Sequence, residues 1–85
     1  MDNRQKPVRE IQEGDVRATI WFNQNSGRRG WYTVTISRMY ARGYQLHFAS
    51  SFRYDDLKDI QKVARIARWW IWWQGGSLSQ KASLR

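Results

Sequence analysis

Apolar residues follow two different periods along the chain, and the change of period divides it into two parts. Up to Phe52 they alternate with polar residues in short runs, a pattern typical of strands with one buried face. From Asp55 to Gln74 they recur every three or four residues, which predicts one helix of about 20 residues, roughly 30 Å long. The pattern therefore predicts several strands followed by a single C-terminal helix.

Four strands are predicted before the helix, at residues 8–13, 15–23, 31–40 and 44–52. The second is the clearest, because its residues alternate strictly between an apolar side and a polar side. The expected inward residues are Val16, Ala18, Ile20 and Phe22 in the second strand, Tyr32, Val34 and Ile36 in the third, and Tyr44, Leu46, Phe48 and Phe52 in the fourth.

Short links between the strands favour an antiparallel meander. Gly14-Asp15 and Ala41-Arg42-Gly43 are turn signals, and residues 24–30 form a loop. We therefore expect an α+β domain over residues 7–76, a four-stranded antiparallel meander sheet followed by one long C-terminal helix (ββββα). Residues 1–6 are expected to be a flexible basic arm, and residues 77–85 a disordered polar tail.

The predicted helix has one apolar arc that suits packing on the sheet. Asp55 and Asp56 lie in its first turn, where the helix dipole favours negative charge. Gly75 and Gly76 follow its last turn and are expected to end it. The residues of the arc are Leu57, Ile60, Val63, Ala64, Ala67, Trp70 and Ile71.

Several large apolar side chains of the helix fall outside this arc. Ile66, Trp69 and Trp73 lie on a second side, and Trp72 lies on a third, beside two arginines. Three explanations are open: packing under loops or against the sheet edge, cover by a second copy of the chain, and stacking of nucleic-acid bases. We predict that Ile66, Trp69 and Trp73 form the interface of a homodimer.

The chain is strongly basic, with a formal net charge of +8 over 85 residues. Such a balance is typical of proteins that bind a polyanion, nucleic acid before membrane, although solubility alone is an alternative explanation. The sheet face opposite the helix is predicted to be polar, basic and aromatic. It is expected to carry Arg17, Trp21, Trp31 and His47, with Arg28, Arg29, Arg38 and Arg42 at its loops and strand ends.

Arginine side chains and exposed tryptophans on one open surface suit single-stranded nucleic acid. Arginines neutralise phosphates, and aromatic rings stack on unpaired bases. Trp21 and Trp31 are the predicted stacking residues. The alternative for these two tryptophans is a cross-strand aromatic pair that stiffens the sheet, or a dimer contact.

Catalysis is not expected from this sequence. His47 is the only histidine and there is no cysteine, which excludes histidine-pair and thiolate metal sites. Asp55 and Asp56 diverge around the helix, and the dipole explains both. We expect no catalytic site, no metal, no cofactor and no small-molecule substrate. The polar start and the five-residue apolar run Trp69–Trp73 predict a cytoplasmic protein without a signal peptide or membrane partner.

Four segments carry a resemblance to a family of short uncharacterised bacterial proteins. They are KPVREI at residues 6–11, ATIW at 18–21, YTVTISRMY at 32–40, and the stretch from SFRYDDL through KVA to WWI at 51–71. The order of four strands and a helix also resembles the positive cofactor four-like transcriptional coactivators and, more distantly, the Whirly proteins. That resemblance implies a homodimer formed through the helices, with single-stranded DNA bound on the sheet, and a role in transcription regulation.

The sequence thus predicts a non-catalytic homodimer that binds single-stranded nucleic acid, DNA in preference to RNA, on its open sheet face. The main alternative is a protein interaction or assembly module that uses its tryptophan-rich helix and sheet face.

Overall fold

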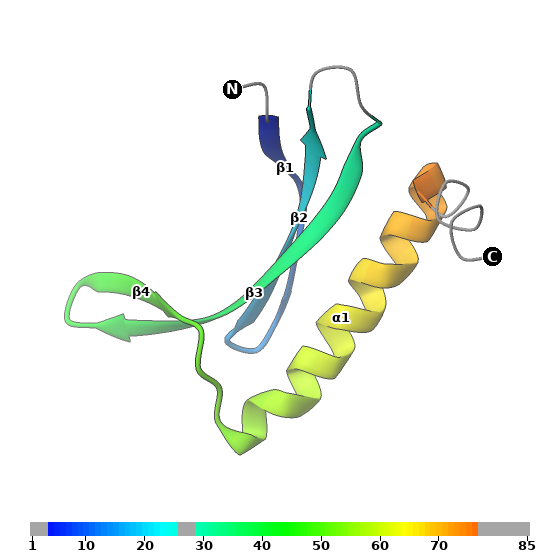
Figure 1. Ribbon diagram of the computed structural model, residues 1–85. Helices are drawn as coiled ribbons and strands as arrows, with labels where there is room; N and C mark the ends of the chain where they lie inside the picture. The colour runs from blue at the N-terminus through cyan, green and yellow to red at the C-terminus, as the bar shows by residue number, and fades with distance from the viewer. Residues whose placement is uncertain (1–3, 26–28, 77–85) are drawn as a thin grey trace.

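The structure is a computed structural model that describes residues 4–25 and 29–76 (Figure 1). The predicted tail 77–85 and the first three residues of the predicted arm lie outside the described residues. In chain order the elements are β1 (Arg4–Glu13), β2 (Val16–Gln24), β3 (Trp31–Arg42), β4 (Gln45–Ala49), a 3₁₀ turn (Tyr54–Asp56), α1 (Leu57–Ile71) and a π-helical turn (Trp72–Gly76).

The four strands form one antiparallel sheet in the order β1-β2-β3-β4, and α1 lies across one face of it (Figure 1). This confirms the predicted α+β fold of a four-stranded meander followed by a C-terminal helix. Figure 1 also shows that β3 is long and bent, so that its far end and β4 project away from the helix as a hairpin.

The core lies between α1 and the first two strands. Val16, Ala18 and Ile20 alternate along β2 and are completely buried against Val63 and Ala67 of α1. They are the predicted apolar side of this strand. Residues packed around this centre are Ile11 of β1, Tyr32 and Ile36 of β3, Phe52, and Ile60, Ile66, Trp70 and Ile71 of the helix.

Glycines with positive φ make the two tight hairpin turns. Gly14 has φ +57° and opens the turn from β1 to β2, and Gly43 has φ +65° and opens the turn from β3 to β4. A glycine at the first of two central positions is what a type II′ hairpin turn requires. Each turn contains two residues, because Glu13 pairs with Val16 and Arg42 pairs with Gln45.

The first strand is longer than predicted. It begins at Arg4 instead of Val8, and Arg4 to Lys6 of the predicted arm pair with the end of β2. Pro7 lies within it, and the pairing register shifts between Pro7 and Arg9. Pro7 is tolerated because β1 is an edge strand, where a missing N–H costs no ladder hydrogen bond.

The prediction that Tyr44, Leu46 and Phe48 face the core is wrong. Tyr44 lies in the turn and is fully exposed, Leu46 is 57% exposed and Phe48 is 52% exposed. The predicted connection 41–43 would have paired Tyr40 with Tyr44. The observed turn is Gly43-Tyr44, and it pairs Tyr40 with His47. The partner of Tyr40 therefore shifts by three residues, and a shift by an odd number exchanges the two sides of a strand, so Leu46 and Phe48 face away from the helix.

The helix also differs from its predicted form at three points. Leu57 and Ala64, predicted to be in the buried arc, are exposed because α1 packs on β1 and β2 more than on β3. At the far end, Gly75 and Gly76 belong to the π-helical turn, so the helical path continues through the glycines that were expected to end it.

Asp56 fixes the start of the helix. Its Oδ2 accepts a hydrogen bond from the backbone N–H of Arg53 at 2.8 Å and lies 3.7 Å from Nε of Arg38 on β3. The same Arg38 Nε donates to the carbonyl oxygen of Ser51 at 3.0 Å. The helix dipole alone therefore does not account for Asp56. This buried carboxylate also joins the helix to the third strand.

Candidate functional site

The sheet face opposite α1, here called the open face, is built by alternate residues of neighbouring strands. Arg17, Thr19, Trp21 and Asn23 of β2 stand opposite Ser37, Thr35, Thr33 and Trp31 of β3. Because their alternating neighbours pack on α1, these residues share the side away from the helix. The pairing of Met39 with Phe48 and of Ala41 with Leu46 extends the open face onto the hairpin.

Polar side chains fix the central part of the open face. Nε1 of Trp21 donates to Oγ1 of Thr35 at 2.9 Å. Nδ2 of Asn23 lies 3.0 Å from Oγ1 of Thr33 and 3.3 Å from the carbonyl oxygen of Trp31. Asn23 is only 4% exposed, so its side chain stabilises the sheet and is not accessible to a ligand. These bonds hold Trp21 and the Trp31 backbone in fixed positions.

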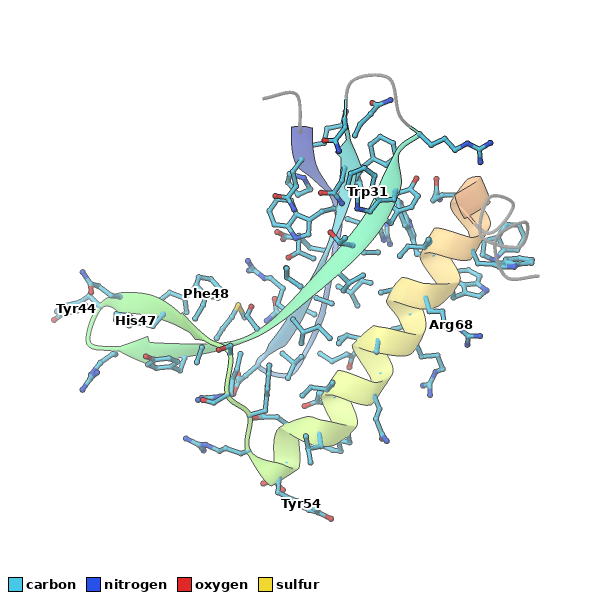
Figure 2. The ribbon with its side chains drawn as sticks, in the orientation of Figure 1. Trp31, Tyr44, His47, Phe48, Tyr54 and Arg68 are labelled. Atoms are coloured by element: carbon cyan, nitrogen blue, oxygen red, sulfur yellow. The ribbon has the colours of Figure 1, made fainter. Side chains whose placement is uncertain are left out.

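Two aromatic rings of the open face are accessible to solvent. Trp31, at the start of β3, is 39% exposed, and Phe48 in β4 is more than half exposed (Figure 2). Trp21, the other predicted stacking residue, is half-buried and held by Thr35. Phe48 was not predicted as a site residue, because the sequence pattern placed it in the core.

Arg17 connects the middle of the open face to the hairpin. Its Cζ lies 5.4 Å from the centroid of the Phe48 ring, in a cation–π contact. Its Nη1 is 4.0 Å from Oε2 of Glu10 on β1, a partly exposed ion pair. Arg17 therefore lies between an acidic residue and an exposed ring, and its position agrees with the predicted one.

Arg38 and His47 lie on the helix side of the sheet, contrary to their predicted placement on the open face. Arg38 joins Asp56 and Ser51 and is largely covered. The His47 ring stacks on the Tyr40 ring, with centroids 5.4 Å apart and planes at 21°. Both placements follow from the register, which puts alternate residues of β3 from Tyr32 to Arg42 on the helix side.

Two of the three remaining predicted arginines are described by the structure. Arg29 is exposed just before β3, and Arg42 is exposed beside the Gly43-Tyr44 turn. Arg28 lies outside the described residues. Arg17 and Arg29 are therefore the predicted phosphate-binding residues that the described structure leaves at the open face or its end, whereas the register puts Arg42 on the helix side of the sheet.

The helix carries a second apolar surface, the tryptophan cluster of Trp69, Trp72 and Trp73. Trp69 and Trp73 are each 60% exposed, with ring centroids 5.8 Å apart in an edge-on arrangement. Trp72 is also exposed, 5.5 Å from Trp73. Ile66, which was predicted to join Trp69 and Trp73 in a dimer interface, instead packs partly against the core.

A shallow groove of about 350 Å³ separates α1 from β3. It exists because the helix lies over the first two strands and leaves much of the third uncovered. Five of its six described lining residues are apolar, and the sixth is an arginine. The lining residues are Val34, Ile36, Ala64, Ala67, Arg68 and Ile71.

Residues 4–25 and 29–76 contain no group of three or more histidine, cysteine or carboxylate side chains placed to hold a metal ion. Within the same residues, no helix is both long enough and apolar enough to cross a membrane.

Comparison of the chain with family models, with curated proteins and with solved structures gave no match.

Proposed function

We propose that the protein binds single-stranded nucleic acid on its open face and does not catalyse a reaction. The proposal rests on the presence of two accessible aromatic rings and a guanidinium on the face that α1 leaves free. Trp31 and Phe48 offer their rings to solvent, and Arg17 lies against Phe48. The predicted resemblance to positive cofactor four-like and Whirly proteins supports single-stranded DNA as the ligand.

The binding energy comes from stacking and from phosphate neutralisation. Each base stacked on an aromatic ring contributes roughly 1–3 kcal/mol, and this contribution does not depend strongly on the base. Arg29 is exposed just before β3 and suits a phosphate at that end of the surface. The net charge of +8 attracts any polyanion from a distance. Binding is therefore expected to have little sequence preference.

A single strand fits this surface better than a duplex. Bases in a duplex are stacked on each other, and their faces cannot reach Trp31 or Phe48. A duplex is usually recognised by a helix or a ribbon in a groove, and α1 is bound to the sheet through Val63 and Ala67. The exposed rings are useful only to a ligand whose bases are unpaired.

Fluorescence anisotropy of a labelled oligothymidine, titrated with protein at low and moderate salt, tests the proposal. We expect binding that a duplex competitor does not displace and that weakens steeply as salt rises. Trp31→Ala and Phe48→Ala should each weaken it about fivefold to about a hundredfold, corresponding to one lost stacked base. Tyr54→Ala is the matched control, an exposed aromatic at the helix start, away from Trp31 and Phe48 (Figure 2).

Absence of binding at low salt would contradict the proposal. Binding that is equal in Trp31→Ala, Phe48→Ala and Tyr54→Ala would contradict the stacking mechanism and leave only charge attraction. Displacement by the duplex at equal concentration would argue for backbone recognition without base contact.

A second candidate function is a protein interaction module, favoured by the tryptophan cluster. Large exposed apolar patches mark interaction sites more often than chance, and tryptophan is enriched among the residues that dominate binding energy. Trp69→Gln with Trp73→Gln should leave oligothymidine binding unchanged and abolish partner binding if this surface serves a protein. Loss of oligothymidine binding in this double variant would instead place the nucleic acid on the helix.

A further inference from the structure

The two edges of the sheet differ in how well they are protected against pairing with another strand. An edge strand exposes a row of unpaired N–H and C=O groups that another chain can use. β1 carries three features that block such pairing: Pro7, a register shift beside it, and charges of both signs from Lys6 to Glu13. β4, with the sequence QLHFA, has none of the three.

The hairpin that contains β4 also lacks cover. α1 packs on the first three strands, and Leu46 and Phe48 remain more than half exposed on the open face. Figure 2 places Tyr44 at the tip of the hairpin, with His47 and Phe48 along it and away from α1. An isolated two-stranded ribbon is only marginally stable in water, and further strands stabilise it.

We infer that β4 pairs with β4 of a second copy of the chain, which joins two sheets into one eight-stranded sheet. Two antiparallel copies of one strand are related by a two-fold axis, so the contact closes on itself. A strand without formal charge suits this contact, because two chains of net charge +8 repel each other at most other places. A second copy is therefore the occupant that these observations favour.

The ladder fixes the register of this pairing. Next to a two-residue turn, alternate residues of β4 form backbone hydrogen bonds with β3, beginning with Gln45. The backbone N–H and C=O groups of Leu46 and Phe48 therefore point away from β3, toward the free edge. Full overlap of the two five-residue strands sets Leu46 opposite Phe48 of the second copy. His47 then lies on the two-fold axis, opposite the same residue of the other chain, with the two Cα atoms about 4.5 Å apart.

Pairing at β4 would also make the two open faces continuous. Phe48 and Arg17 of each copy would meet near the axis, with Trp31 toward the outer part of each sheet. The binding surface for a single strand would double in length without any new side chain. Only this consequence rests on the proposed function, and the pairing itself does not.

This interface differs from the predicted one on the helix. If the β4 edge and the tryptophan cluster were both two-fold interfaces, the chains would assemble beyond a dimer, into a closed tetramer or a filament. Ile66 packs partly against the core, so Trp69 and Trp73, each 60% exposed, are the two predicted interface residues that remain largely exposed. The dimer axis therefore lies at β4, and the tryptophan cluster lies outside the interface.

Sedimentation equilibrium of the full chain over about a hundredfold range of concentration is the first test. We expect a species of twice the chain mass of 10.2 kDa. Leu46→Lys places two like charges near the axis and should weaken association by at least about tenfold. Leu57→Lys is the matched control, because Leu57 is a similarly exposed leucine on α1, 49% exposed, and it should leave the mass unchanged.

Cysteine substitutions provide a second readout that does not depend on the folding of Leu46→Lys. The chain contains no cysteine, so a single introduced thiol has one possible partner. His47→Cys should give a disulfide-linked dimer under mild oxidation, because Cα separations of about 4.4–6.8 Å allow the bond. Gln61→Cys on the exposed side of α1 should give no disulfide-linked dimer under the same conditions.

Salt separates the failure of this inference from the failure of the proposed function. Pairing of two basic chains should strengthen as salt screens their repulsion, whereas oligothymidine binding should weaken. A monomer at every concentration would overturn the inference and leave the binding proposal intact. The inference would also be wrong if Leu46→Lys still formed the dimer and the double variant Trp69→Gln with Trp73→Gln did not. That result would show that the dimer forms through the helix.

Discussion

β2 and β4 both alternate apolar with polar residues, yet their apolar side chains have opposite environments. Val16, Ala18 and Ile20 of β2 are completely buried under α1. Leu46 and Phe48 of β4 are more than half exposed on the opposite face of the sheet. Alternation therefore reports that a strand has two chemically different sides, and the position of the helix decides whether the apolar side is buried.

The two regions also use their arginines differently. On the helix side, Arg38 is held by the carboxylate of Asp56 and the carbonyl of Ser51, which ties the base of the hairpin to the start of the helix. On the open face, Arg17 lies against the exposed Phe48 ring. Arg38 stabilises the fold, whereas Arg17 lies where a ligand can reach it. Two arginines of one sheet therefore have different roles.

The largest expected effect is in the buried region. Ile20→Ala removes a completely buried side chain from the centre of the core and should lower the free energy of unfolding by about 2–5 kcal/mol. Ile20→Val, which removes one methylene, should cost about 0.5–1.5 kcal/mol. Urea denaturation of both variants measures the difference. If the two variants were equally stable, Ile20 would not fill the core as described.

A smaller effect is expected at the joint between the two regions. Asp56→Ala removes the acceptor for the Arg53 N–H and leaves Arg38 without its carboxylate, which should cost about 1–3 kcal/mol. Asp56→Asn keeps an acceptor oxygen and should cost less. Thermal denaturation measures stability, and hydrogen exchange should show faster exchange at Arg38–Arg42 in Asp56→Ala. A change within about 0.5 kcal/mol would contradict this role.

Much of the fold could be predicted because it depends on local patterns. The period of two in β2 and the period near 3.6 in α1 are properties of neighbouring residues, and both gave the correct elements. The order of strands followed from short connections. Val63 and Ala67, at the centre of the predicted arc, are the buried residues of α1.

The faces of β4 could not be predicted in this way, because they depend on the register across a turn. The tripeptide Ala41-Arg42-Gly43 and the dipeptide Gly43-Tyr44 are both reasonable turns, and the pairings that they give differ by three residues, an odd number that exchanges the sides of β4. In the observed register, His47 lies on the helix side of the sheet and Phe48 lies on the open face. The glycine itself favoured the second turn, since Gly43 is the first central residue that a type II′ turn requires.

The role of Asp56 was hidden for a different reason. The nearby sequence already explains an acidic residue at a helix start, through the helix dipole. Its second partner, Arg38, is 18 positions earlier in the chain, and only the folded structure brings the two together. Because the helix dipole already accounted for Asp56, nothing in the sequence indicated its contact with Arg38. The predicted site therefore placed Arg38 on the wrong side of the sheet.

The smallest expected effect is in the hairpin, and it depends on concentration. Leu46→Ala removes an exposed side chain, so in dilute protein its effect on the free energy of unfolding should stay within about 0.5 kcal/mol. At high concentration the wild-type chain should gain stability by pairing through β4, because association favours the folded state by mass action. Leu46→Ala should lose part of that gain.

Thermal denaturation at low and high protein concentration measures this difference. The melting temperature of wild type should rise with concentration more than that of Leu46→Ala, while Leu57→Ala, at a similarly exposed position on α1, should follow wild type. Equal concentration dependence in all three proteins would mean that Leu46 is exposed in the assembly as well as in the monomer. The contrast between β2 and β4 would then be complete, with one strand buried by the helix and the other open to solvent or ligand on its apolar side.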